Sequence, residues 1–133
     1  METTRIIIAG GRNFRDYEML KRNMRRFLKV LHMHYEFHKV EIISGGAKGA
    51  DALGERFAQE FGYDLKIMKA DWDQYGKRAG YIRNVAMADY ALESKHSFLV
   101  AFWDGKSKGT SHMIDIARNK LKNVDIVFYK GLT

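Results

Sequence analysis

Five short apolar runs alternate with longer segments in which apolar residues recur at helical spacing, and this alternation strongly constrains the fold. The runs cover residues 5–9, 40–44, 64–68, 98–103 and 124–128, and they are rich in Ile, Val, Leu and Phe, as expected of strands covered on both faces. Strands that alternate with helices usually join one parallel sheet with helices packed on it. The pattern predicts an α/β fold: a three-layer domain around a mainly parallel five-stranded sheet.

Each interval between the runs predicts one helix. The first begins near Tyr17, with Asp16 as its candidate N-cap, and the third and fourth cover residues 78–92 and 109–121. The chain has no proline, so no helix is expected to be interrupted. The apolar faces of the first and second helices are predicted to carry Leu20, Met24, Phe27, Leu28 and Leu31, and Leu53, Phe57 and Phe61, respectively.

Length, charge and cysteine content narrow the class of protein. With 133 residues and 46% hydrophobic content, the chain is expected to form a single domain over residues 1–133. It has no cysteine, which excludes disulfides, thiolate zinc sites and a cysteine nucleophile. Lys and Arg number 23 against 16 Asp and Glu, a net charge of +7 that favours anionic partners such as nucleotides, nucleic acids or acidic surfaces.

The sequence contains no pattern typical of export or membrane insertion. An apolar strand-like run begins within a few residues of Met1, without the basic region and long apolar stretch of a signal peptide. No segment approaches the ~18 consecutive apolar residues of a membrane span. We therefore expect a cytoplasmic protein without a membrane partner.

Unusual residues follow four of the five predicted strands. In an open parallel sheet, ligands bind beyond the carboxyl ends of the strands, where neighbouring loops separate. We therefore expect one ligand site bordered by all four loops. Its candidate residues are Gly10, Gly11 and Arg12 after the first strand, Ser44, Gly45, Gly46, Ala47, Lys48, Gly49 and Asp51 after the second, Asp71 and Trp72 after the third, and Asp104, Gly105, Ser107, Gly109 and Thr110 after the fourth.

The glycine-rich loop at 44–51 has the composition of a phosphate-binding loop. Its glycines permit backbone conformations that other residues rarely adopt, so that amide groups can converge on an anion at the start of the next helix. Lys48 adds a full positive charge. The loop is neither a P-loop, because no Lys-Ser or Lys-Thr pair follows Gly49, nor a dinucleotide motif, because the Gly-x-Gly start is missing. The structural alternative is an ordinary tight turn between a strand and a helix.

The side chains suggest roles within this site. Gly109 and Thr110, at the start of the fourth helix, can hold phosphate, and the arginines at 12, 78 and 83 can bind phosphate or carboxylate. Trp72 and Tyr75 offer rings for a base, while Asp51 and Asp71 suit ribose hydroxyls or a base edge. Each also has a structural alternative, such as a solvated arginine or an aspartate that complements a helix dipole.

Two further motifs are weaker. Residues 105–109 fit the Gly-x-Ser-x-Gly pattern of a nucleophile elbow, but His112 is the only later histidine, and no acid lies between it and Ser107. His32, His34 and His38 with Glu36 have spacing that a metal could use, although histidines at the end of a helix also complement its dipole. We predict no metal site.

The first predicted helix carries a basic stripe opposite its apolar face. Such a stripe is usually solvated, and its alternative role is to bind nucleic acid phosphates. Phe27 belongs to the apolar face, so base-stacking aromatic residues interleaved with the stripe are lacking, which argues against single-strand or sequence-specific recognition. The stripe comprises Lys21, Arg22, Arg25, Arg26 and Lys29.

Taken together, the motifs resemble the YspA/YpsA-related branch of the SLOG superfamily, over nearly the whole chain. This superfamily, named for the DNA-processing protein A (Smf) and Lonely Guy proteins, has a Rossmann-like sheet that handles nucleotides or their derivatives. The resemblance adds Arg83 and Asn84 to the candidate site and implies possible self-association into a homo-oligomer. The matching motifs are Gly10-Gly11-Arg12-x-Phe14-x-Asp16, the loop at 44–51, Ala70-Asp71-Trp72-x-x-Tyr75-Gly76-Lys77-x-Ala79-Gly80-x-x-Arg83-Asn84-x-x-Met87 and the loop at 105–110.

The resemblance implies a ligand class but no reaction. Lonely Guy enzymes remove the base from a nucleoside monophosphate with a catalytic Glu, and here Met113 occupies that position and cannot transfer a proton. We therefore expect binding of a nucleotide or nucleotide-derived ligand, as a sensor or carrier, without a required cofactor. The alternatives are a phosphoribohydrolase-like N-glycosidase, in which Asp51 or Asp71 replaces the missing acid, and a DNA- or RNA-binding accessory protein.

Overall fold

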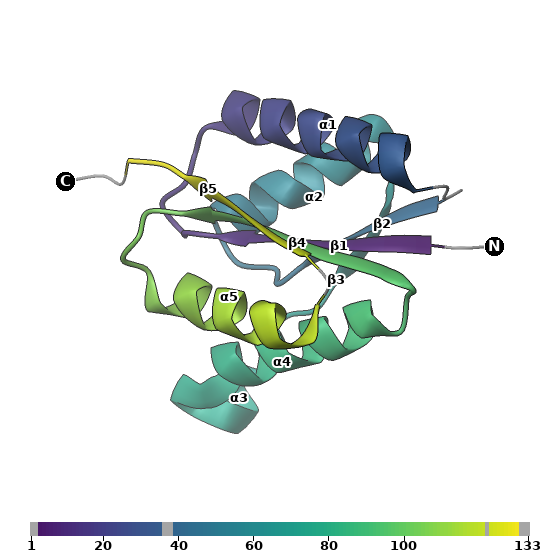
Figure 1. Ribbon diagram of the computed structural model, residues 1–133. Coiled ribbons are helices and arrows are strands. Elements are labelled where there is room, and N and C mark those ends of the chain that lie inside the picture. Colours follow the sequence, from purple (N-terminus) through teal and green to yellow (C-terminus); the bar gives the residue numbers. More distant parts are fainter. Residues whose placement is uncertain (1–2, 36–38, 122, 131–133) are drawn as a thin grey trace.

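A computed structural model describes residues 3–35, 39–121 and 123–130. Five strands form a single sheet in the order β3-β2-β1-β4-β5, and every neighbouring pair is parallel. The predicted three-layer α/β domain is confirmed, with a sheet that is wholly rather than mainly parallel (Figure 1). The strands are β1 (Thr3–Gly10), β2 (Lys39–Ser44), β3 (Asp64–Ile67), β4 (His96–Trp103) and β5 (Asn123–Phe128).

Helices cover both faces of the sheet. In Figure 1, α1 (Tyr17–His34) and α2 (Ala50–Phe61) lie on one face, and α4 (Ala79–Leu92) and α5 (Lys108–Lys120) lie on the other. Successive β1 residues point to opposite faces, so Ile6 and Ile8 join the core under α1 and α2, whereas Ile7 and Ala9 join the core under α4 and α5. The apolar run of β1 is thus buried on both sides.

The first helix starts where its sequence predicts. The Asp16 side chain accepts a hydrogen bond from the backbone N–H of Met19 at 3.0 Å and thereby caps α1. Leu20, Met24 and Leu28 are buried along the sheet-facing side of the helix. This register directs the intervening charged residues to solvent.

Two parts of the fold differ from the prediction. One is the segment between β3 and α4, and the other is the pair of outer strands. The helix predicted over 78–92 is confirmed as α4, but a short helix, α3 (Trp72–Tyr75), and a 3₁₀ turn, Gly76–Arg78, precede it and were not predicted. The outer strands are not covered on both faces, because β3 and β5 form the edges of the sheet. Ile67 is 42% exposed and Phe128 is 62% exposed.

The strand order places a topological switch between β1 and β4. The chain builds outward from β1 to β3 at one edge and then returns to β4, on the other side of β1. The loops after β1 and β4 therefore lead to helices on opposite faces and separate, which opens a crevice at the carboxyl ends of these strands. None of the described helices combines the length and apolar character that crossing a bilayer requires.

Candidate ligand-binding site

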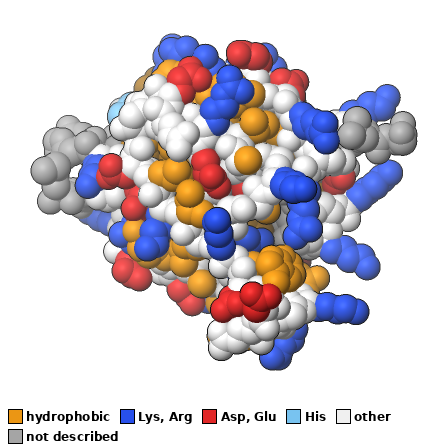
Figure 2. All heavy atoms as spheres, turned by 180° about the vertical axis from the view of Figure 1, so that it is seen from behind, with side chains coloured by type: hydrophobic (Ala, Val, Ile, Leu, Met, Phe, Trp, Pro, Cys, Tyr) orange, Lys and Arg blue, Asp and Glu red, His pale blue; other side chains and the backbone are white. Residues whose placement is uncertain are grey.

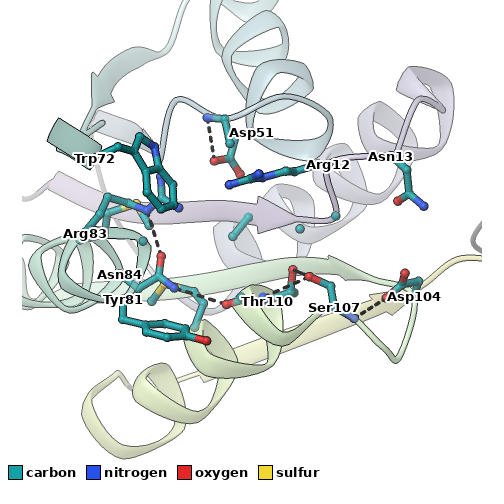
Figure 3. Close-up of a pocket in the computed structure, with 18 of the residues that line it drawn as sticks. Arg12, Asn13, Asp51, Trp72, Tyr81, Arg83, Asn84, Asp104, Ser107 and Thr110 are labelled. Carbon is teal, nitrogen blue, oxygen red and sulfur yellow. Dashed lines mark hydrogen bonds between the residues drawn. The ribbon is translucent and has the colours of Figure 1, made fainter. Parts of the chain in front are cut away.

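A cleft of about 470 Å³, here called the central cleft, lies at this switch point. Its size falls in the range usual for small-molecule sites. Figure 3 shows that its polar side chains come from both faces of the sheet and converge beyond the strand ends. Its predicted lining residues are Gly10, Gly11, Arg12, Ala47, Asp51, Trp72, Arg83, Asn84, Asp104, Ser107, Gly109 and Thr110, joined by residues that were not predicted as ligand contacts: Ala9, Asn13, Lys77, Gly80, Tyr81, Met87 and Met113.

The glycine-rich loop after β2 is closed by the protein's own side chains. The Ala47 N–H donates to Asp51 Oδ2 at 3.1 Å, and the Gly46 N–H donates to Ser44 Oγ at 3.1 Å. Ser44 is fully buried and its hydroxyl lies 2.7 Å from Glu55 Oε2, to which it donates. Two of the amides expected to bind a phosphate are therefore already paired within the loop.

Asp51 sits at the border between this loop and the central cleft. Its side chain belongs to the first turn of α2, and the residue is only 5% exposed. Burial raises the pKa of Asp51 to about 6, against the opposing effects of the Ala47 hydrogen bond and the Arg83 and Arg12 charges. Figure 3 shows the Arg12 side chain extending beneath the Asp51 carboxylate. Carboxylate and guanidinium groups thus share one wall of the cleft.

Arg83 and Asn84 connect three strand-end elements. Arg83 Nη1 donates to the Gly45 carbonyl, and Arg83 Nε donates to Asn84 Oδ1 at 3.0 Å. Asn84 is buried, and its Nδ2 donates to the Gly109 carbonyl at 3.3 Å. This chain links the glycine-rich loop through α4 to the first turn of α5, and it fixes the Arg83 side chain beside the cleft (Figure 3).

The loop after β4 forms hydrogen bonds that cap the start of α5. Asp104 Oδ1 accepts the N–H groups of Lys106 and Ser107, both at 2.9 Å, and these bonds lower the pKa of Asp104. Ser107 is the N-cap residue, with its Oγ facing the Thr110 N–H. Gly109 lies in the first helical turn, and the space that a side chain would occupy there is open. An anion can therefore approach this positive helix end.

Aromatic rings form two other walls of the central cleft. Trp72 is 49% exposed, and the Arg12 guanidinium lies 5.8 Å from its ring centroid. Tyr81, on α4, is 45% exposed and packs against His112 with 4.3 Å between ring centroids. These rings offer flat apolar surfaces on which a planar group can stack.

A second depression of about 640 Å³ adjoins the central cleft, and we call it the basic hollow. The two share four lining residues: Arg12, Ala47, Trp72 and Arg83. The predicted residues Gly45, Gly46 and Lys48 line the basic hollow alone, together with Lys69 and Ala70. The glycine-rich loop and the remaining strand-end loops thus border two adjoining spaces.

Four predicted site residues line neither space. Ser44 is buried beneath the loop, and Gly49 packs against the backbone of Gly11 and Arg12. Asp71 caps α3 by accepting the Gln74 N–H at 3.1 Å. Gly105 forms the turn before α5 with a φ of 83°.

Two lining residues of the central cleft, Lys77 and Tyr81, were not predicted. They lie on either side of Ala79-Gly80, in the same motif as Arg83. This motif was the one signal in the sequence that could have identified them.

The weaker motifs do not assemble into catalytic groups. Ser107 Oγ lies 3.2 Å from Thr110 Oγ1, whereas His112 Nδ1 lies 3.2 Å from Asn84 Nδ2, so this serine and histidine face different partners. No group of three metal-binding side chains occurs within residues 3–35, 39–121 and 123–130. The predicted histidine spacing involves Glu36 and His38, which lie outside the described residues.

The basic stripe borders a depression of about 820 Å³ along α1, and we call this region the α1 basic surface. All five stripe residues line it, and Phe61 and Tyr63 from the end of α2 and the following turn lie beside them. Lys21 Nζ and the Arg25 guanidinium lie 5.6 and 5.5 Å from the Phe61 ring centroid. Aromatic neighbours, which the sequence of the first helix did not reveal, are thus supplied by another element of the fold. Lys21 also pairs with Glu60 at 2.8 Å.

Met113 lies at the boundary between the central cleft and the core. It is 1% exposed and packs in the apolar cluster beneath α4 and α5. No proton can be transferred by its thioether. Asp51 lines the cleft and Asp71 does not, so Asp51 is the one of these two aspartates that can reach a ligand there.

Comparisons with known proteins agree with the motifs. The sequence profile of the YspA, cpYpsA-related SLOG family matches residues 4–75. The Gene 61 protein of Mycobacterium phage D29 is 28% identical over 113 residues, covering 81% of this chain and 83% of the phage protein. No solved structure matches the chain.

Proposed function

Because the chain belongs to the YspA, cpYpsA-related SLOG family, we propose that it binds a nucleotide or a nucleotide-derived small molecule in the central cleft. The observation that carries this proposal is the combination, at one switch point, of an open helix start, two guanidinium groups and two exposed aromatic rings. A nucleotide presents the matching chemistry, namely a phosphate and a planar base.

Each part of the ligand has a matching surface in the cleft. The phosphate approaches the first turn of α5 at Gly109, where the Thr110 hydroxyl adds a donor, and Arg12 supplies a positive charge from the opposite wall of the same cleft (Figure 3). The base stacks on Trp72 or Tyr81. Asp51 faces the space between them, where a carboxylate can accept hydrogen bonds from ribose hydroxyls.

Binding without turnover fits the cleft better than base removal. The position of the Lonely Guy glutamate is filled by Met113, whose side chain is buried in the core. Asp51 is engaged by the Ala47 N–H and lies near two arginines. We therefore propose a sensor or carrier of nucleotides and not a phosphoribohydrolase.

A pair of substitutions at Gly109 tests the proposed site. A side chain at this position meets open space, so Gly109→Ala and Gly109→Asp are both expected to fold, and an aspartate in the first turn even complements the helix dipole. Isothermal titration with the four ribonucleoside 5′-monophosphates is expected to show binding by the wild type and the Ala variant. The Asp variant should lose affinity by at least about tenfold through charge repulsion. Absence of binding of every nucleotide by the wild type would reject the proposal.

A second candidate function, nucleic acid binding, is favoured by the α1 basic surface. The aromatic rings of Phe61 and Tyr63 beside its cations supply the combination typical of single-strand binding surfaces. Binding of a single-stranded oligonucleotide should weaken steeply with salt and be lost when the exposed residues Arg22, Arg25, Arg26 and Lys29 are changed to Glu. Oligonucleotide binding that survives these changes would exclude this surface.

A further inference from the structure

The basic hollow and the central cleft adjoin and share part of their walls. Arg12, Trp72 and Arg83 line both spaces, together with Ala47. Figure 2 looks onto the molecule from the side of β3 and shows Lys and Arg side chains gathered above the projecting α3 segment. A ligand seated in the cleft can therefore extend past these side chains onto a positively charged surface.

The two spaces differ in charge. The central cleft contains the carboxylates of Asp51 and Asp104 as well as its cations. Among the residues that the structure describes, the basic hollow is lined by four cationic residues, Arg12, Lys48, Lys69 and Arg83, and by no acidic residue. Within the part of the chain that the structure describes, neither Lys48 nor Lys69 forms an ion pair. These two charges are therefore available to an external anion.

The loop geometry positions one of these lysines. Gly46 has a φ of 72°, and a β-carbon there would lie 2.7 Å from Lys69 Cγ and 3.5 Å from Lys69 Cε. The aliphatic stem of Lys69 thus lies against the glycine, and both Lys69 and Lys48 line the basic hollow. The parallel register explains this contact, since Ser44 pairs with Ile67 at the ends of β2 and β3, and the Met68 N–H donates to the Ser44 carbonyl at 2.8 Å just beyond them.

We propose that the basic hollow is a second anion subsite of the same ligand site, occupied by a phosphate group that lies beyond the one in the central cleft. This inference rests on the proposed nucleotide binding. It assigns the ligand to nucleotides whose phosphate chain is longer than a monophosphate. Arg12 and Arg83 face both spaces and contact the chain where it passes between them, while Lys48 and Lys69 bind its far end.

The test compares two probe sets on three proteins. The four ribonucleoside 5′-monophosphates and the corresponding 5′-triphosphates are titrated calorimetrically, without divalent cations and at one ionic strength. The proteins are the wild type, a Lys48→Glu/Lys69→Glu variant, and a Lys66→Glu/Arg118→Glu variant that makes the same charge change at exposed positions outside both spaces. Circular dichroism verifies that all three proteins are folded.

The expected result is specific for the longer phosphate chain. Wild type should bind at least one triphosphate about tenfold or more tightly than its monophosphate, because additional charge-assisted hydrogen bonds form. The Lys48→Glu/Lys69→Glu variant should lose most of this preference and keep its monophosphate affinity within about threefold, since exposed charges outside the contact act weakly. The Lys66→Glu/Arg118→Glu control should retain the preference.

The opposite outcomes separate the two proposals. Equal affinity of the wild type for monophosphate and triphosphate, or an undiminished preference in the Lys48→Glu/Lys69→Glu variant, overturns the second subsite and leaves nucleotide binding intact. An equal loss of preference in both charge variants also overturns it, because the effect is then one of net charge. Binding of no nucleotide by the wild type rejects the proposed function itself.

Discussion

Asp51 Oδ2 accepts a hydrogen bond from the backbone N–H of Ala47 at 3.1 Å, inside the glycine-rich loop that precedes its own helix. A carboxylate of the protein thus occupies a position that resembles that of a bound anion in such loops. Gly45 makes this possible, since a β-carbon there would lie 2.8 Å from Asp51 Oδ2 and 2.6 Å from Arg83 Nη1. The Ala47 and Gly46 amides are therefore already paired, and ligand phosphates must use donors other than these two.

The buried carboxylate of Asp51 makes stability depend on pH. Burial raises its pKa from 3.8 to about 6, so the folded chain holds this proton more tightly than the unfolded chain. The resulting stabilisation is complete below pH 3.8 and is lost as the pH rises through about 6. We expect Asp51→Asn, which cannot ionise but still accepts the Ala47 N–H, to gain about 3 kcal/mol relative to wild type between pH 4 and pH 7.

Urea denaturation at several pH values measures this difference. Asp104→Asn provides a control of opposite sign, because the pKa of Asp104 is lowered by the backbone N–H groups of Ser107 and Lys106. Its stabilising contribution appears above the unfolded pKa, so this variant should lose stability relative to wild type as the pH rises. An Asp51→Asn difference that does not change with pH would show that Asp51 ionises normally.

Trp72 should report ligand binding directly. Its ring is half exposed and stands between the central cleft and the basic hollow, whereas Trp103 is held by a hydrogen bond from its Nε1 to the Ser107 carbonyl at 3.1 Å. We expect Trp72→Ala to weaken nucleotide binding by about tenfold, as loss of a base-stacking ring does, and to change stability by about 1 kcal/mol or less. Nucleotide-induced fluorescence quenching should disappear in Trp72→Phe. Quenching that persists there would place the ligand near Trp103.

The glycine-rich loop contains two glycines with different structural roles. Gly49 has a φ of 76°, and a β-carbon there would lie 2.6 Å from the backbone of Arg12, so Gly49→Ala should cost about 3 kcal/mol or more. Gly46 also has a positive φ, but its close neighbour is the movable stem of Lys69. Gly46→Ala should therefore cost about 1–2 kcal/mol and displace Lys69. Thermal denaturation of both variants checks this order, and equal losses would contradict it.

The start of α5 should depend on Asp104. Its Oδ1 atom accepts two backbone N–H groups, so Asp104→Ala leaves both without that acceptor, whereas the amide oxygen of Asp104→Asn can replace it. We expect the Ala variant to lose about 1–2 kcal/mol at pH 7 and to bind nucleotide more weakly, because the first helical turn loosens. Amide hydrogen exchange of Ser107 and Lys106 measures this directly. Unchanged exchange in the Ala variant would contradict the assigned role.

The layered fold could be predicted from the sequence because its determinants are local or periodic. The apolar runs, the helical spacing of Leu20, Met24 and Leu28, and the Asp16 cap all act within a few residues and appear as predicted. The same strand pattern does not reveal which strands form the edges. Strand order depends on how the crossover connections pack, so the exposure of Ile67 and Phe128 could not be read from composition.

The location of the central cleft was predictable, but its internal contacts were not. Its position follows from the strand ends of a parallel sheet, which local patterns indicate. The pairing of Asp51 with Ala47 depends on how the loop bends, and the meeting of Lys69 with Gly46 depends on the register between β2 and β3. Likewise, Phe61 and Tyr63 reach the α1 basic surface from another part of the chain. Contacts of this kind arise only when the elements pack together.

The substitution Met113→Glu tests whether the central cleft can hold a carboxylate at the position that corresponds to the Lonely Guy glutamate. The Met113 side chain is 1% exposed among apolar neighbours, so Met113→Glu places an ionisable group in the core and should raise its pKa. We expect a stability loss of at least about 3 kcal/mol at pH 8 that is smaller at pH 5, where the group is neutral. Met113→Gln, which cannot ionise, should show a loss that does not change with pH, as measured by urea denaturation. A pH-independent loss in Met113→Glu would mean that its carboxylate reaches the water of the cleft, so that this position could accommodate a charged catalytic group.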